Sequence, residues 1–572
     1  MEMKKDRRVT FPAWGMLRFA LLALALVLSG GLEGGPLTIQ PVVSQSGIVV
    51  AGHPEAAAVG AAILSAGGNA IDAAVGVSLT LGAAEPYGSG LGGKLMLLYY
   101  DAESQQAFVV DGMDQAGLSL ETDTYRRLPE VSRYNDWSAV AVPGLPFALH
   151  AAHTRWGRVS WAEAVQPAIT VARQGPLVLE KNRVLFAERE GRLRNNSALR
   201  DLYMPGGELP AIGTRLPHPQ LATSMEVFAR EGIAAFRDGP LAQAIVTASQ
   251  EGGGHLTIED FMEYQARFPE PIEVGFGPYQ LMGSPPPSVG ATLAFAMLKL
   301  LEGLTLEPPL RSAGAVDLIG RAWRLALPIV RDEVSVGPHG LDMWENFLSV
   351  QSIEELRHQL RKPEALAEPS MSTDSGNNDA TTHFVVADAD GNVVSATQSL
   401  SLHFGAGVIA SGIILNNTMS NFVYEDPHHP NFVAPGKRPR STITPTIVSR
   451  DGRPVLALGA PGGQRIPSAV VQVLLDHLVL ERPLGEAIGD TRLHWFRPPD
   501  STGPDIIEAE SSLAEGLERG LGSLGWQVNR REEHGTGRHF GGVNAVSLRP
   551  DGRLEGFADP RRSNAVAIPS NE

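Results

Sequence analysis

Two adjacent threonines, Thr381 and Thr382, stand where a polar run gives way to an apolar one, and a threonine in that setting can act as a nucleophile. The polar run covers residues 372–379 and the apolar segment covers 384–387; an Asp-Gly dipeptide then leads into a second β-rich run, 393–400. This order predicts a hairpin that presents Thr381 at the tip of a strand. On its own, the pair would also suit an ordinary strand, because threonine favours β structure.

Cleavage of the peptide bond before Thr381 would give that residue both a nucleophile and a general base. Its hydroxyl would be the nucleophile, and its new α-amine, with an ordinary pKa of about 7.7–8.0, would accept the hydroxyl proton near neutral pH. The chain has no cysteine and no His-Glu-x-x-His motif. Two adjacent histidines, His428 and His429, lie in a proline-flanked loop and are expected to be solvated. We therefore expect no metal and no cofactor.

The elements that must position the threonine can be predicted from periodicity. Small apolar residues recur at helical spacing over residues 53–84, with a break at a Gly-Gly-Asn run, which predicts two packed helices. A buried strand is predicted over 95–100, and a helix over 467–480. From residue 381 onward the chain is strand-rich, with hairpin turns expected at Asp390-Gly391, Asp451-Gly452 and Asp551-Gly552. Together these elements favour a layered α/β architecture.

The N-terminal segment has the pattern of an export signal. Four basic residues within positions 4–8 precede an apolar run, 19–28, and then small residues. The run is about half of the ~20 residues needed to span a bilayer, so we expect a signal peptide over 1–30, with a short uncleaved anchor as the alternative. Either way, a periplasmic or extracellular location is expected. Residues 31–46 are expected to be a flexible linker and 362–379 an exposed connector.

Bulk properties narrow the class of protein further. The chain has 572 residues, 43% of them hydrophobic, which is enough for a large core. Its formal net charge of −16 argues against a nucleic-acid partner. A Gly-x-Gly-x-x-Gly match at 88–93 follows a predicted helix and precedes a strand, the reverse of the dinucleotide-binding order. The absence of any Gly-x-Ser-x-Gly motif counts against a serine α/β-hydrolase.

Further motifs run in a fixed order on both sides of the threonine pair. Before it are Gly-Ile-Val-Val-Ala at 47–51, Gly-Gly-Asn-Ala-Ile-Asp-Ala-Ala-Val at 67–75, Glu-Pro at 85–86, Gly-Ser-Gly-Leu-Gly-Gly at 88–93, Val-Ala-Val-Pro-Gly at 140–144, Trp-Gly at 156–157, Gln-Pro-Ala-Ile at 166–169, Leu-Thr-Ile-Glu-Asp-Phe at 256–261 and Ser-Pro-Pro-Pro-Ser at 284–288. After it are Leu-Asn-Asn at 415–417, Lys-Arg-Pro at 437–439, Pro-Thr-Ile at 445–447, Gly-Ala-Pro-Gly-Gly-Gln-Arg at 459–465, Asn-Ala-Val at 544–546 and Asp-Pro-Arg at 559–561. From about residue 47 to 562, this series resembles the γ-glutamyltransferase (glutathione hydrolase) family of N-terminal-nucleophile hydrolases.

The resemblance implies a fold and a maturation step. The fold is a four-layer αββα sandwich to which two segments of one self-cleaved precursor contribute strands. Cleavage between Ala380 and Thr381 would give a large subunit, 47–380, and a small subunit, 381–572, which stay together as a heterodimer. Thr381 would first attack the carbonyl of Ala380 in an N-to-O acyl shift that water resolves. The freed Thr381 would then form an acyl-enzyme with a substrate amide and pass the acyl group to water or to an amine.

By the same resemblance, Gly462 and Gly463 form the oxyanion hole, where glycines let backbone N–H groups approach a developing negative oxygen. Ser399 stands where the family has a second threonine beside the nucleophile, and it keeps the hydroxyl. A loop before a helix and an ordinary strand serine are the alternative interpretations of these residues.

The substrate pocket departs from the family pattern. Met113 occupies the position of an arginine that holds the glutamyl α-carboxylate, and methionine offers no hydrogen bond to a carboxylate. Asn421 replaces the aspartate that receives the glutamyl α-amine. The substrate-binding positions assigned by resemblance are Ser401, Thr418, Asn421, Ser441 and Thr442, for which plain turn chemistry is the alternative. The connection over 422–437 is short, which predicts a reduced lid over the site.

Three functions remain open at this point. The first is an exported, self-cleaving γ-glutamyltransferase-like enzyme acting on glutathione and other γ-glutamyl compounds, with water or an amine as acceptor. The second is an acylase of the same mechanism for glutaryl-like or other amides that lack the α-amine. The third is an exported binding protein that kept the fold and lost the chemistry. The departures at Met113 and Asn421 leave the acyl group undecided.

Overall fold

The computed structural model describes residues 37–330, 339–361, 380–497, 504–531 and 539–570. The expected signal peptide (1–30) and the expected connector (362–379) lie outside these ranges. Among the described helices, none combines the length and the apolar character needed to cross a membrane.

A six-stranded antiparallel sheet carries the threonine pair at its centre. Its strand order is β18-β2-β7-β8-β3-β4. The strands are β2 (Gly47–Ala51), β3 (Lys94–Asp101), β4 (Gln106–Gly112), β7 (Ala380–Asp388), β8 (Val393–Ser401) and β18 (Ala565–Ala567). β7 and β8 form the predicted hairpin around Asp390-Gly391, and β3 confirms the predicted buried strand.

A seven-stranded antiparallel sheet lies against the first, in the order β1-β17-β16-β12-β11-β6-β5. Its strands are β1 (Val42–Ser44), β5 (Ile272–Phe276), β6 (Tyr279–Gly283), β11 (Thr446–Arg450), β12 (Arg453–Gly459), β16 (Asn544–Leu548) and β17 (Leu554–Ala558). The other two Asp-Gly turns join β11 to β12 and β16 to β17, as expected. Each sheet takes strands from both sides of residue 380, which confirms that two segments of the chain build them.

The expected flexible linker is, in its described part, bound to the body of the protein. Val42 pairs with Gly556 in the β1–β17 ladder. Upstream of β1, the N–H groups of Leu37 and Ile39 donate to the carbonyls of Gly489 and Gly485 at 3.1 and 3.3 Å. Backbone pairing of this kind leaves no visible sequence pattern, because the segment uses its main chain rather than its side chains.

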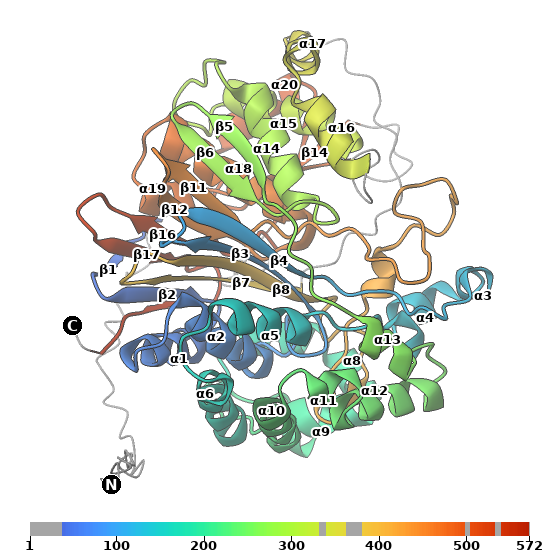
Figure 1. Cartoon of the computed structure of the whole chain (residues 1–572). Helices are drawn as coiled ribbons and strands as arrows, with labels where there is room; N and C mark the ends of the chain where they lie inside the picture. The colour runs from blue at the N-terminus through green and yellow to red at the C-terminus, as the bar shows by residue number, and fades with distance from the viewer. Residues whose placement is uncertain (1–36, 331–338, 362–379, 498–503, 532–538, 571–572) are drawn as a thin grey trace, which may run out of the picture. The chain divides into compact units, whose positions relative to one another are not determined.

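Helices cover the outer faces of both sheets (Figure 1). α1 (Pro54–Ser65), α2 (Ala70–Ala84) and α5 (Leu145–Trp156) pack on the six-stranded sheet, with α6 (Trp161–Gln174) behind them. α14 (Gly290–Leu301) and α18 (Ile466–Leu474) pack on the seven-stranded sheet, with α15 (Ala313–Pro328) on α14. This confirms the αββα sandwich. The predicted helix pair is α1 and α2, and Asn69 caps α2 by accepting from two of its first N–H groups.

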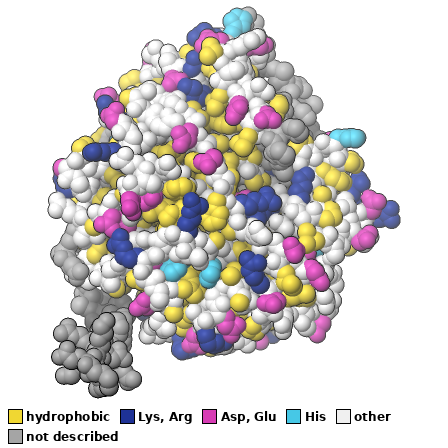
Figure 2. Space-filling view, viewed as in Figure 1, with side chains coloured by type: hydrophobic (Ala, Val, Ile, Leu, Met, Phe, Trp, Pro, Cys, Tyr) yellow, Lys and Arg dark blue, Asp and Glu magenta, His cyan; other side chains and the backbone are white. Residues whose placement is uncertain are grey.

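The remaining described α-helices and β-strands surround these four layers. They are α3 (Thr122–Arg126), α4 (Glu130–Tyr134), α7 (Glu180–Glu188), α8 (Glu190–Asn195), α9 (Ser197–Tyr203), α10 (Pro219–Glu231), α11 (Ala234–Arg237), α12 (Pro240–Glu251), α13 (Ile258–Glu263), α16 (His339–Phe347), α17 (Val350–Leu360), α19 (Leu484–Gly489), α20 (Glu515–Ser523), β9 (Ile409–Ala410), β10 (Ile413–Ile414), β13 (Leu493–Phe496), β14 (Ile506–Glu510) and β15 (Gln527–Arg531). On the face shown in Figure 2, acidic and basic side chains are interspersed rather than gathered by sign.

Alternation along β7 decides which way the two threonines face. Val385 and Ala387 pack in the core between the sheets, whereas Phe384 and Val386 pack under the helices. Successive side chains of a strand point to opposite faces. Thr381 therefore lies on the side between the sheets, and Thr382 lies on the side of the helices.

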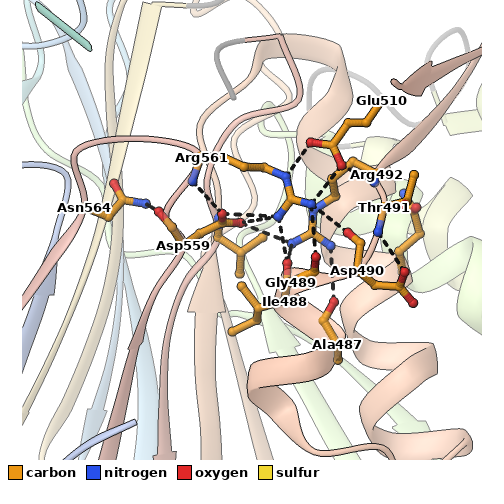
Figure 3. Close-up of polar contacts among 12 residues, drawn as sticks. Ala487, Ile488, Gly489, Asp490, Thr491, Arg492, Glu510, Asp559, Arg561 and Asn564 are labelled. Atoms are coloured by element: carbon orange, nitrogen blue, oxygen red, sulfur yellow. Dashed lines mark hydrogen bonds and ion pairs between the residues drawn. The ribbon is translucent and has the colours of Figure 1, made fainter. Parts of the chain in front are cut away.

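A buried ion network fixes the C-terminal segment near Thr381 (Figure 3). The guanidinium of Arg561 lies between Glu510, at 2.5 Å, and Asp559, at 3.2 Å, and it also donates to the carbonyls of Ile488 and Asp490. Asp559 in turn receives a second buried arginine at 3.3 Å. The next residue along the chain, Arg562, donates to the carbonyl of Thr381 at 3.4 Å. The network therefore holds the segment that touches the predicted nucleophile.

We expect Arg561→Met to lower the free energy of unfolding by about 3–5 kcal/mol, because it leaves Glu510 and Asp559 with less of their buried counter-charge. The measurement is the first unfolding midpoint in urea. Arg553→Met is the matched control, since it removes an exposed partner of Asp551 in the β16–β17 turn and should leave the midpoint unchanged. Equal midpoints for the two variants would contradict the structural role given to Arg561.

Candidate active site

A pocket opens between the sheets, next to the start of β7, where Thr381 lies, and the end of β8, where Ser399 lies. The space between its walls, together with the open mouth, amounts to about 520 Å³. Its lining residues are Lys94, Thr381, Ser399, Ser401, Asn421, Arg440, Ser441, Thr442, Ile443, Gly463 and Gln464. Most of the residues predicted from the sequence are thus brought to one place.

Thr381 touches both Ser399 and the bond that is predicted to break. The side chain of Thr381 is 4% exposed, and its hydroxyl donates to the Ser399 hydroxyl at 3.1 Å. The Ser399 hydroxyl donates to the carbonyl oxygen of Ala380. Two hydroxyls and the carbonyl before Thr381 are therefore in one continuous hydrogen-bonded chain.

A β-bulge lies opposite this bond. Thr381 pairs with Ser399 while Ala380 pairs with Ser401, so Leu400 on β8 has no partner in β7. Instead, the N–H of Leu400 donates to the Gly88 carbonyl at 3.1 Å, and its carbonyl accepts from Asn417 at 3.2 Å. A bulge of this type bends the strand and redirects the side chains next to it. Here it separates the Ala380–Thr381 peptide from the regular ladder.

The second threonine has a different environment. On the helix side of the sheet, Thr382 lies next to the buried carboxylate of Glu85, and both side chains lie against Gly52. Burial alone would raise the pKa of Glu85, but its ion pair and hydrogen bond with Lys181 hold that pKa below its usual value. Tyr87 also donates to Glu85, at 3.1 Å. Thr382 thus faces the helices and does not line the pocket.

The predicted oxyanion-hole glycines lie at the turn that leads into α18. Gly462 and Gly463 have φ values of 134° and 57°, which side chains disfavour. Gly463 lines the pocket, and its carbonyl accepts from the Thr442 hydroxyl at 2.8 Å. Gly462 precedes it and does not line the pocket. The first N–H groups of a helical segment lack intrahelical partners and suit a negative oxygen.

The predicted substrate-binding residues divide into two groups. Ser401, Asn421, Ser441 and Thr442 line the pocket. Thr418 lies behind them, fully buried, with its hydroxyl 2.9 Å from that of Ser401. Asn421 donates to the Ser401 hydroxyl at 3.4 Å.

Met113 belongs to the hydrophobic core. Its side chain is fully buried in the cluster between the sheets, and it does not line the pocket. Its backbone N–H donates to Asp111 at 2.8 Å, and its carbonyl accepts from Tyr264 at 2.7 Å. The position at which an arginine was expected by resemblance therefore supplies only packing.

Two cations that the sequence analysis did not single out line the pocket, namely Lys94 and the half-buried Arg440. Lys94 opens β3 and is 2% exposed; its ammonium donates to the hydroxyls of Ser401 at 2.5 Å and Thr418 at 3.3 Å. The Thr418 hydroxyl donates to the carboxyl of Asp114 at 2.5 Å. A lysine at the head of an apolar strand, directly after two glycines, is the signal that could have identified it.

Burial governs the charges of this group. Desolvation lowers the pKa of Lys94 to about 8, against the opposing effect of Asp114. Desolvation also raises the pKa of Asp114 to about 7, with Lys94 as the main opposing influence. The described residues that line the pocket include two cations and no aspartate or glutamate.

The short connection over 422–437 packs beside the pocket, because Asn431 hydrogen-bonds to the backbones of Asn421 and Arg440, which line it. Tyr424 stacks on Tyr125 of α3 with ring centres 5.7 Å apart. No residue of this connection is among the described residues that line the pocket, in keeping with a reduced lid. His428 is exposed in the same loop, and the described part of the chain holds no group of three or more His, Cys, Asp or Glu placed to bind a metal.

Comparison with known proteins gives consistent results. The family model described as Gamma-glutamyltranspeptidase matches residues 56–568. The Acylase ACY 1 proenzyme of Pseudomonas sp. (strain SE83) is 32% identical over 535 residues, covering 91% of this chain and 93% of the acylase. The Glutathione hydrolase proenzyme of Bacillus subtilis (strain 168) is 29% identical over 555 residues, with 92% of each chain covered. The crystal structure of cephalosporin acylase from Bacillus halodurans superposes with a TM-score of 0.84 at 25% identity, covering 96% of this chain and 100% of the other.

Proposed function

The chain belongs to the γ-glutamyltranspeptidase family, and we propose that it is an amidohydrolase that cleaves itself before Thr381 and then works through an acyl ester on that threonine. The observation that carries the proposal is the contact of the Thr381 and Ser399 hydroxyls with the carbonyl of Ala380. The bulge at the same bond supports it, because bulges are over-represented next to active sites, where they redirect side chains.

In the self-cleavage step, the Thr381 oxygen bonds to the Ala380 carbonyl carbon. Ser399 stabilises the negative charge that develops on the carbonyl oxygen, since its hydroxyl already points at that atom. The C–N bond then breaks, and its nitrogen, with the proton from the threonine hydroxyl, becomes the Thr381 α-amine. Water hydrolyses the remaining ester, which gives Ala380 a free carboxylate, restores the Thr381 hydroxyl and leaves two chains within one folded body.

In turnover, the same atoms act on a substrate amide. The α-amine accepts the Thr381 hydroxyl proton as the oxygen attacks, and it returns a proton to the leaving amine. Backbone N–H groups at Gly462 and Gly463 stabilise the tetrahedral oxyanion. Water or an amine then takes the acyl group from Thr381. We also propose that the enzyme is exported to the periplasm or beyond by the segment 1–30.

The family's default substrates are glutathione and other γ-glutamyl compounds, but the pocket favours the second candidate, an acylase for glutaryl-like amides. A γ-glutamyl group carries an α-ammonium that needs an acidic partner, and the described lining residues offer only the neutral Asn421 at the expected place. The names of two relatives, Acylase ACY 1 and cephalosporin acylase, point the same way.

Hydrolysis of two anilides, glutaryl and γ-glutamyl, tests the proposal. We expect the purified, self-cleaved protein to hydrolyse the glutaryl anilide with a kcat/KM roughly tenfold or more above that for the γ-glutamyl anilide. A factor of this size corresponds to the free energy of about one charged hydrogen bond, which the α-ammonium would lack. A preference for the γ-glutamyl compound would restore the first candidate. A chain that neither cleaves itself nor hydrolyses either compound would indicate the inactive binding protein.

A further inference from the structure

We propose that Lys94 is the specificity-determining residue of the acyl pocket, and that it binds the free carboxylate of substrates that are monoamides of short dicarboxylic acids without an α-amine. The turnover part of this inference rests on the proposed function; the binding part does not. In the family pattern described above, an arginine at the position of Met113 binds this carboxylate. Lys94, the first residue of β3, would bind it instead.

The first argument is the hydrogen bonding of the ammonium. A lysine has three N–H donors. Two of them are directed at Ser401 and Thr418, and Lys94 lines the pocket; the described residues give its ammonium no third acceptor, so one N–H is available to a ligand. A carboxylate is the acceptor that gains most from such a donor, because bonds between opposite charges are about twice as strong as neutral ones.

The second argument is that the surroundings of Lys94 are built to hold it. Ser401 adopts a φ of 75°, an uncommon conformation for serine, and in it accepts from both Lys94 and Asn421. Thr418 accepts from Lys94 and donates to Asp114, so the contact between the two charged residues passes through a hydroxyl. Strained backbone of this kind is concentrated where a ligand is bound.

The third argument is the sign of the charge. Lys94 and Arg440 line the pocket, and no described lining residue is acidic. A glutaryl group brings one negative charge and meets only attraction. A γ-glutamyl group brings an ammonium as well, which would lie near Lys94 without an acidic partner, and like charges in a buried site are unfavourable.

A purely structural role for Lys94 is the competing explanation. In that case the lysine serves only as counter-charge to Asp114, and its loss would lower stability without changing substrate preference. The two explanations therefore differ in one measurable ratio, the kcat/KM for a charged acyl group over that for a neutral one of the same length.

The test compares glutaryl and pentanoyl anilides, which share a five-carbon acyl chain and differ in the carboxylate. We expect Lys94→Met to reduce the glutaryl-to-pentanoyl ratio of kcat/KM by about 10- to 100-fold, because only the glutaryl compound carries the carboxylate. Lys94→Arg should keep most of the ratio. Lys299→Met, on the partly exposed lysine of α14, is the control that should leave the ratio unchanged. An unchanged ratio in Lys94→Met would overturn the inference.

Calorimetric binding of glutarate and pentanoate keeps the test independent of turnover. We expect wild-type protein to bind glutarate at least about tenfold more tightly than pentanoate, and Lys94→Met to lose this difference. If no anilide is hydrolysed but glutarate binding depends on Lys94, the proposed function fails and the inference stands. If anilides are hydrolysed but Lys94→Met binds both acids as the wild type does, the inference fails and the proposed function stands. The urea midpoint of each variant shows whether it is folded.

The pH profile gives a readout that a structural role would not move. The charged groups around the lysine are Asp114, which pairs with it through Thr418, Arg440 in the pocket, and Arg438, which acts on Asp114. Because kcat/KM reports the free enzyme and the pKa of Lys94 is lowered to about 8, the glutaryl preference should fall as the pH rises above that value. In Lys94→Arg the charge persists, and the fall should disappear.

Discussion

Thr381→Ala should abolish both self-cleavage and amide hydrolysis. The purified variant is expected to remain a single chain that is uncut between residues 380 and 381, and its kcat should fall by a factor on the order of 10⁴ or more, as when the nucleophile of another acyl-transfer enzyme is removed. The reason is that one oxygen serves both reactions. Denaturing electrophoresis and anilide hydrolysis measure the two effects, and intact-mass analysis shows whether the small subunit of the wild type begins at Thr381.

Thr381→Ser is the matched comparison, because it keeps the hydroxyl and the contact with Ser399. It should cleave itself and retain measurable turnover. Cleavage of Thr381→Ala at the same bond, or a wild-type subunit that begins at another residue, would contradict the nucleophile assigned here.

Gly462→Ala has the next largest expected effect, a loss of about 10²- to 10³-fold in kcat with little change in KM, the usual consequence of disturbing an oxyanion hole. Gly462 has a φ of 134°, and a Cβ there would lie 3.3 Å from the carbonyl of Phe540. The backbone must therefore shift, and the N–H groups of the 462–463 turn shift with it. Steady-state kinetics with the better anilide would show the effect.

Gly452→Ala separates this effect from general backbone strain. Gly452 also has a positive φ, 75°, but lies in the β11–β12 turn with nothing within 4 Å of a new Cβ. Its substitution should lower stability slightly and leave kcat unchanged. Equal kcat values for the two alanine variants would show that the 462–463 turn does not form the oxyanion hole.

The sequence was informative where local signals carry the information. The Asp-Gly turn and flanking β-rich runs were enough to predict the β7–β8 hairpin, and the Gly-Gly-Asn break was enough to predict α1 and α2. The Ala380–Thr381 bulge could not be predicted, because it depends on Gly88 and Asn417 binding the backbone of Leu400. The strand β1 was missed for the same reason: its partner, β17, lies some five hundred residues away in the chain.

For the site, resemblance and structure contribute different parts. Resemblance supplied the residues around Thr381, and it predicted that Met113 stands where an arginine would be expected. It could not show what replaces that arginine, since Lys94 becomes part of the pocket only through Ser401 and Thr418, more than three hundred residues later. Thr418 was assigned to the substrate from its position, yet it lies behind the lining, where it connects Lys94 to Asp114.

The interleaving of the two sheets has a consequence for the mature protein. β7 lies between β2 and β8, β3 lies beside β8, and β6 lies beside β11, so the segments before and after residue 380 share backbone ladders in both sheets. After a cut before Thr381, neither half could leave without dismantling both sheets. The halves would therefore not exchange between molecules or separate on dilution. The two subunits of each mature enzyme would always come from the same precursor chain.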